Sequence, residues 1–161
     1  MAGLAGAGRP EAEGAMKRLI KGAWVVVADE GKALVLTNAG DALTPVLTLA
    51  ERLETADLLA ESDRSARGRD HKQHETVEPP DYHRMAGATL AAAVAARLRR
   101  AQAEGALAAV VLVAPPQMLG ALRAALGDSL EGRTLAAIAK TLTGHPLPKI
   151  AAILAEDLSV L

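Results

Sequence analysis

The chain has 161 residues, a formal net charge of −1 and no cysteine. This length favours one domain with a sizeable core, the charge excludes polyanion binding by net charge alone, and the lack of cysteine excludes disulfides and thiolate metal sites. Half of the residues are hydrophobic, yet Trp24 and Tyr82 are the only aromatic ones. The core must therefore be built from Leu, Val, Ile and Ala.

The N-terminal residues 1–15, MAGLAGAGRPEAEGA, carry no regular pattern. They lack a basic segment followed by an apolar one, so we do not expect a secretion signal. No apolar run approaches about 18 residues, which excludes a membrane-spanning helix. We expect an N-terminal extension over residues 1–15, a domain over 16–161, and a cytoplasmic location.

Three extended segments come first in the domain. Ala23 to Asp29 and Lys32 to Asn38 are rich in β-branched and aliphatic residues and are separated by Glu30-Gly31, which predicts a β-hairpin. A third segment within Leu43–Leu53 contains Pro45. Proline cannot donate to a strand ladder, so this segment is expected to form an edge strand.

A long polar stretch follows, from Thr55 to Pro80, and it has no hydrophobic period. It ends in Glu78-Pro79-Pro80. The pattern predicts a loop. A loop of this length inside a compact domain is usually functional or disordered.

The second half alternates helices and strands. Val110 to Val113 is a continuous apolar run, typical of a parallel strand buried on both faces. Pro115-Pro116 follows at once, and proline favours the first turn of a helix. The expected elements are a helix over Met85–Ala103, the strand at Val110–Val113, a helix through Leu126, a strand within Arg133–Leu142 and a helix over Pro146–Leu158.

This order, β-β-β-α-β-α-β-α, predicts the fold class. Three antiparallel strands lead into two right-handed crossovers. The expectation is a single α/β domain with a mixed five-stranded sheet of the ribonuclease H-like kind.

Several segments carry a family resemblance. Ser62 to Asp70 reads SDRSARGRD, Leu112 to Arg123 reads LVAPPQMLGALR, and Lys140 to Thr143 reads KTLT. Over roughly Lys21 to Leu154 the chain resembles the bacterial host attachment proteins, described as required for attachment to host cells. These are similar to the middle domain of archaeal and eukaryotic peptide-chain release factors. The resemblance implies a role linked to translation.

The release-factor likeness does not extend to peptide release. In those factors the loop between the third strand and the first helix carries Gly-Gly-Gln. The corresponding residues here, Arg67 to Gln73, read RGRDHKQ. Gln73 is not preceded by glycines, so its backbone lacks the same conformational freedom.

The long loop is the first candidate binding site. Arginine offers bidentate contacts to phosphate, and the loop cations that could bind RNA or another anion are Arg64, Arg67, Arg69 and Lys72. An equal number of acids lies among them: Glu61, Asp63, Asp70 and Glu75. The alternative is a solvated loop with internal salt bridges.

The turn Ala114–Gln117 is the second candidate. It follows a parallel strand, at the sheet edge where α/β folds bind ligands, and a helix N-terminus there can bind an anion. Arg123, two turns on, and Lys140, at the end of the last strand, could approach the same edge. The alternative is a purely structural turn.

Neither a metal site nor a catalytic cluster is predicted. His71, His74 and His83 lie in or beside the polar stretch and are interpreted as surface residues. Asp29 ends the first strand, but the fourth strand offers no acid to join it, so we interpret Asp29 as a turn or capping residue. No cofactor is expected.

Together these features predict a non-catalytic cytoplasmic protein of the host attachment family. The expected partner is the ribosome or RNA, bound through the 55–84 loop. One alternative is a hydrolase acting on a phosphorylated or nucleic-acid substrate at the 114–123 turn. Another is a protein-interaction module that influences attachment to host cells. The sequence leaves the oligomeric state open.

Overall fold

The computed structural model describes residues 18–66 and 79–159, and in this part of the chain five strands form one mixed sheet. The strands are β1 (Trp24–Ala28), β2 (Lys32–Asn38), β3 (Leu47–Glu54), β4 (Val110–Val113) and β5 (Thr134–Ile138). Their spatial order is β3-β2-β1-β4-β5. The pairs β1–β2 and β2–β3 are antiparallel, while β1–β4 and β4–β5 are parallel. The prediction of a mixed five-stranded α/β domain is confirmed.

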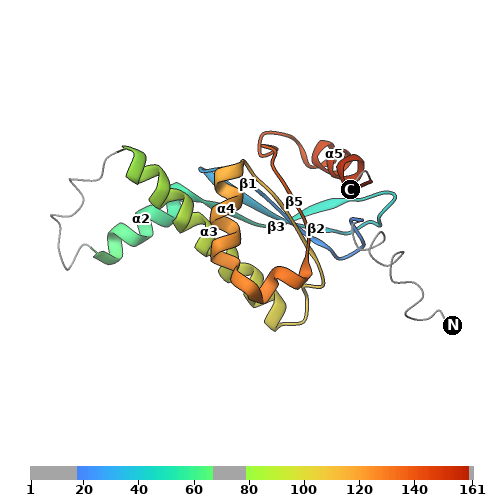
Figure 1. The fold of residues 1–161 in the computed structure, drawn as a ribbon, viewed down its shortest axis with the longest axis horizontal. Helices are drawn as coiled ribbons and strands as arrows, with labels where there is room; N and C mark the ends of the chain where they lie inside the picture. The colour runs from blue at the N-terminus through green and yellow to red at the C-terminus, as the bar shows by residue number, and fades with distance from the viewer. Residues whose placement is uncertain (1–17, 67–78, 160–161) are drawn as a thin grey trace.

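The helices form layers on both faces of the sheet (Figure 1). The described residues contain α2 (Thr55–Ala66), α3 (Pro79–Ala103), α4 (Pro116–Leu126) and α5 (Leu147–Ser159), with a 3-10 helix η3 at Gly127–Arg133. Helices α3 and α4 cover one face, and α5 covers the other. Helix α2 and the first turns of α3 extend beyond the sheet on the left of Figure 1.

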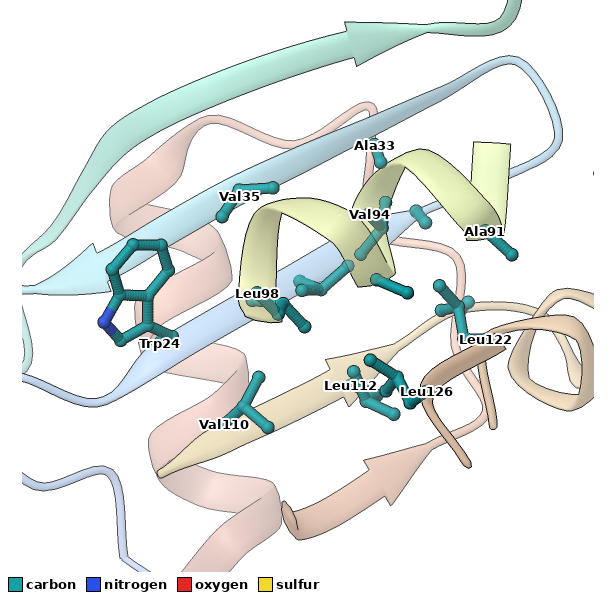
Figure 2. Packing of buried hydrophobic residues seen from close by; sticks show 14 of the residues in the cluster. Trp24, Ala33, Val35, Ala91, Val94, Leu98, Val110, Leu112, Leu122 and Leu126 are labelled. Carbon is teal, nitrogen blue, oxygen red and sulfur yellow. The ribbon is translucent and has the colours of Figure 1, made fainter. Parts of the chain in front are cut away.

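The central strands β1 and β4 are buried along their whole length, as their apolar runs predict. Alternate residues of β1 contribute to the apolar layers on the two faces of the sheet. Trp24 and Val26 face α3 and α4, whereas Val25 and Val27 face α5. Figure 2 shows the first of these layers, with Val94 and Leu98 of α3 packed over the sheet. One sheet therefore separates two apolar clusters.

Trp24 fixes the end of the α3 layer. Its indole Nε1 donates a hydrogen bond to the carbonyl oxygen of Ala106 at 3.0 Å. The guanidinium carbon of Arg97 lies 5.1 Å from the centre of the indole ring, a cation–π contact. Arg97 Nε also donates to Glu51 Oε1 at 2.7 Å, so α3 is tied to the edge strand β3.

The β2–β3 connection is organised around the buried Asn38. Its amide nitrogen donates to the carbonyl oxygens of Leu19, Ile20 and Asp41 at 2.8, 3.1 and 3.3 Å. Its amide oxygen accepts hydrogen bonds from the N–H groups of Gly40 and Val46 at 3.0 and 2.8 Å. A β-carbon on Gly40 would lie 2.2 Å from the carbonyl oxygen of Thr44, so only glycine fits this turn.

The predicted loop from Thr55 to Pro80 is wrong at both ends. Residues 55–66 form α2, and α3 begins at Pro79 rather than Met85. The segment from Thr55 to Ala66 has no glycine or proline to interrupt a helix. Its Leu58 packs against the core while the polar residues remain outside. The described residues therefore contain α2, a helix that the sequence does not indicate, and the 3-10 helix η3 is also additional to the predicted order.

Two further segments are strands as predicted. The segment with Pro45 leads into β3, which lies at one edge of the sheet. The segment Arg133–Leu142 contains β5, which lies at the other edge. Each edge pair contains one register shift, between Val35 and Leu36 in β2–β3 and between Val110 and Val111 in β4–β5.

Candidate functional site

The carboxyl ends of β1 and β4 border an open depression of about 520 Å³. It is lined by Asp29, Glu30 and Gly31 from the turn after β1 and by Pro115, Pro116, Gln117 and Met118 from the start of α4. This is the edge of the sheet at which the sequence predicts a site. Asp29 and the Pro115 turn, which are far apart in the sequence, therefore lie beside the same depression.

Asp29 is held by hydrogen bonds on both carboxylate oxygens. Its Oδ1 accepts from the N–H groups of Gly31 and Lys32 at 2.7 and 2.9 Å. Its Oδ2 accepts from the hydroxyl of Thr143 at 2.5 Å. These contacts close the turn after β1 and join it to the segment before α5.

The same contacts set the acidity of Asp29. Partial burial raises its pKa, but the hydrogen bonds from Thr143, Lys32 and Gly31 and the positive charge of Lys32 outweigh that effect. The pKa of Asp29 is therefore below its ordinary value of 3.8. An ionised carboxylate with its oxygens occupied closes a turn, as the sequence predicts for this residue.

The Pro115 turn begins α4 without a side-chain cap. The carbonyl oxygen of Pro115 accepts from the N–H of Leu119 at 2.9 Å, and the N–H of Ala114 donates to Ile138 in β5 at 3.0 Å. The predicted proline at the first helical turn is thus confirmed. The neighbouring charges are acidic, from Asp29 and Glu30, and anion binding at this turn stays a prediction.

Arg123 does not join that turn. It lines a second depression, of about 460 Å³, with Asp128 and Glu131 beside it and the residues of β5 along it. The structure therefore separates Arg123 from Pro115 and divides the predicted 114–123 site into two surfaces.

Lys140 forms an ion pair with α5. Its Nζ lies 2.7 Å from Asp157 Oδ2 of α5, and the Lys140 side chain is half-exposed. This ion pair neutralises the cation and ties the end of β5 to α5. The prediction that Lys140 binds RNA or an anion is not tested by this contact.

The remaining candidates belong to the stretch of sequence from α2 to the first turns of α3, and these two described parts form an arm. Arg64 lies on α2, near the end of the helix that points away from the sheet (Figure 1). Arg67, Arg69, Lys72, His71 and His74 lie outside the described residues. His83 lies on the first turns of α3.

The base of the arm is firmly attached to the turn after β1. The hydroxyl of Thr55, the first residue of α2, donates to the carbonyl oxygen of Glu30 at 2.6 Å. The Thr55 N–H donates to the carbonyl oxygen of Gly31 at 2.9 Å. The arm and the depression therefore share the turn at residues 29–31.

Two residues that bind the turn at residues 29–31 were not identified from the sequence. Thr143 is buried and meets Asp29 across 114 positions in the chain, and no local pattern marks that contact. The start of α2 at Thr55 could have been predicted, since a threonine ahead of an acidic first turn is typical of a helix start. Among the described residues, no group of three or more His, Cys, Asp or Glu side chains is placed to hold a metal ion.

In the part that the structure describes, no helix has the length and apolar character that a membrane span requires. Comparison with curated proteins gave no match. A family model described as "Protein required for attachment to host cells" matches residues 24–154, from the start of β1 into α5. The chain therefore belongs to the family of proteins required for attachment to host cells.

Proposed function

We propose that this host attachment protein is a non-catalytic, cytoplasmic binding protein whose arm, formed by α2 and the first turns of α3, engages RNA, with the ribosome as the principal partner. Family membership connects the chain with attachment to host cells. In this proposal the attachment role is indirect and follows from an effect on translation.

The shape and anchoring of the arm carry the proposal. The arm extends beyond the sheet (Figure 1), and its base is fixed by the two Thr55 hydrogen bonds and by Leu58, which packs against the α3 layer. A binding element gains affinity when its scaffold is ordered before contact, because less entropy is lost on binding. The fixed base provides that order.

The chemistry of the sequence that begins on α2 and follows it supports an RNA partner. Arg64 lies on α2, and Arg67, Arg69 and Lys72 follow it in the sequence. Guanidinium groups bind phosphate oxygens in pairs of hydrogen bonds. The equal number of acids in this segment favours docking into a shaped RNA surface over general attraction to polyanions.

The fold adds support at a coarser level. The strand order β3-β2-β1-β4-β5, with an antiparallel and a parallel half, is the order we assign to a ribonuclease H-like sheet. The release-factor middle domain places its working loop between the third strand and the first long helix. The arm occupies that position here.

The test is co-sedimentation with ribosomes on a sucrose gradient at low and at moderate salt. The full chain is compared with a triple variant, Arg64→Ala, Arg67→Ala and Arg69→Ala. The matched control replaces three exposed cations elsewhere: Arg18→Ala, Arg100→Ala and Lys149→Ala. We expect the wild-type and control chains to travel with ribosomes at low salt and the arm variant to remain at the top.

Salt dependence separates the specific contact from general attraction. Each phosphate contact contributes to the slope of affinity against salt concentration, so losing three arginines should flatten that slope. Wild-type protein that stays at the top of the gradient at low salt would contradict the proposal. So would an arm variant that travels with ribosomes as well as the control.

A further inference from the structure

The two edges of the sheet differ in their protection against pairing. Edge strand β3 carries Glu51, Arg52 and Glu54, and charged side chains on an edge oppose the addition of another strand. Edge strand β5 reads TLAAI and carries no charge. In residues 18–66 and 79–159 no strand pairs with its outer edge, and its five residues are half-buried.

A groove runs beside this uncharged edge. It is the depression of about 460 Å³ between β5 and the α4–η3 segment, and Leu112, Leu126 and Ala136 supply apolar lining. Figure 2 shows Leu126 next to Leu112, with the β5 arrow beyond them at the sheet margin. Apolar surface beside an open strand edge is the combination that pairs with another chain.

The charges around the groove are of both signs. Arg123 lines it from α4, and Asp128 and Glu131 line it from η3. The patch thus offers one positive and two negative groups. In a two-fold symmetric contact the same patch meets itself, so it must contain both signs to be complementary.

We propose that this surface, β5 with the groove beside it, is the interface between two copies of this chain. The two β5 strands pair antiparallel about a two-fold axis and continue the sheet from one copy into the other. Residues 134–138 then meet only uncharged side chains of their own kind. Arg123 of one copy faces the acids of η3 in the second copy.

A second copy fits this surface better than an unrelated peptide strand. The groove carries both signs, so when the patch meets itself Arg123 of each copy can face the acids of η3 in the other. An isologous pair also uses both unprotected edges at once and leaves the charged β3 edges outside.

Sedimentation equilibrium of the full chain at micromolar concentrations tests this interface. We expect the wild type to have twice the mass of one chain. Arg123→Glu gathers three acids on each patch and should raise the dimer dissociation constant about tenfold or more. The matched control is Lys149→Glu on α5, an exposed cation away from the groove, and it should leave the constant unchanged.

A charge exchange separates the proposed contact from a folding defect. Adding Glu131→Arg to Arg123→Glu restores one positive and two negative groups and should bring the dimer back, while circular dichroism remains that of the wild type. A monomeric wild type throughout the concentration range would overturn the proposal and leave the β5 edge to another strand. A dimer that Arg123→Glu does not weaken would overturn it as well.

Discussion

Asp29 joins three parts of the molecule through one carboxylate. It closes the turn after β1 with two backbone N–H groups, and it receives the hydroxyl of Thr143 from the segment before α5. The same turn also binds the start of α2, because the carbonyl oxygens of Glu30 and Gly31 accept hydrogen bonds from Thr55. A substitution of Asp29 should therefore weaken both the start of α2 and the attachment of the segment before α5.

Thr143→Val tests this link. The variant keeps the shape of the side chain but removes the donor to Asp29, and it should cost about 1–2 kcal/mol of unfolding free energy at pH 7.

The effect of this variant should depend on pH, because folding lowers the pKa of Asp29. The stability that the ionised Asp29 contributes is fully present above the ordinary pKa of 3.8 and is lost as pH falls through the folded pKa. The deficit of the variant should therefore narrow in acid.

Urea unfolding at pH 7 and at acidic pH measures this deficit. The control is Thr48→Val, whose hydroxyl lies in an exposed pair with Thr37, and it should change stability by less than about 0.5 kcal/mol. A deficit for Thr143→Val that is equally large at both pH values would contradict the role given to Asp29.

Asn38 offers a second test at the scale of one residue. Asn38→Asp replaces the amide nitrogen by an oxygen that faces three carbonyl oxygens in a buried site. The loss of donors should cost about 3 kcal/mol or more at neutral pH. Thermal unfolding should show part of this loss recovered in acid, where the carboxyl group is protonated and donates again. An unchanged melting temperature at neutral pH would refute the account.

At the scale of elements, α2 depends on its first residue. Thr55→Val removes the hydrogen bond to the Glu30 carbonyl oxygen and should destabilise the start of the helix by about 1 kcal/mol. We expect faster amide hydrogen exchange in residues 55–66 with little change in β1 and β4. The sheet amides of the same sample are the internal control. Equal acceleration in both would mean that α2 is not a separate unit of opening.

The elements differ in how visible they are in the sequence. The strands β1, β2 and β4 are predictable because unbroken runs of Val, Ala and Leu fit a strand buried on both faces. Helix α2 is not, since its polar residues outweigh Leu58 and Leu59, and its helical character rests on a start signal and on packing of Leu58. Propensity is a weak guide where tertiary contacts decide.

The candidate site is less predictable than the fold. The position of the Pro115 turn at the sheet edge follows from strand direction alone, and the role of Asp29 as a turn residue is confirmed. The partners Thr143 and Asp157 are not visible, because each meets its partner only through the folded crossover. The separation of Arg123 from Pro115 likewise depends on the orientation of α4 in the fold, because its first residues line one depression and Arg123 lines the other.

At the scale of the whole molecule, the two apolar layers share a single sheet. Leu122 of α4 and Leu154 of α5 are fully buried on opposite faces, and truncation of either to alanine should cost about 2–5 kcal/mol. Because β1 and β4 contribute to both layers, we expect one cooperative transition.

Fluorescence of Trp24 tests this cooperativity. Trp24 is the only tryptophan and lies in the α3 layer, whereas Leu154→Ala disturbs the α5 layer. The variant should move the fluorescence and circular dichroism midpoints together. Leu122→Ala in the same layer as Trp24 is the matched comparison. A fluorescence transition that stays at the wild-type midpoint in Leu154→Ala would show that the layers unfold independently.

The passage from β3 to α2 has a mechanical consequence. Glu54 ends the strand and Thr55 begins the helix, so no residue between them can serve as a hinge. A load applied at the far end of the arm is carried directly into an edge strand, where hydrogen bonds to β2 resist it on one side only. Tension on the arm would therefore peel β3 from the sheet before it disturbed β1 and β4.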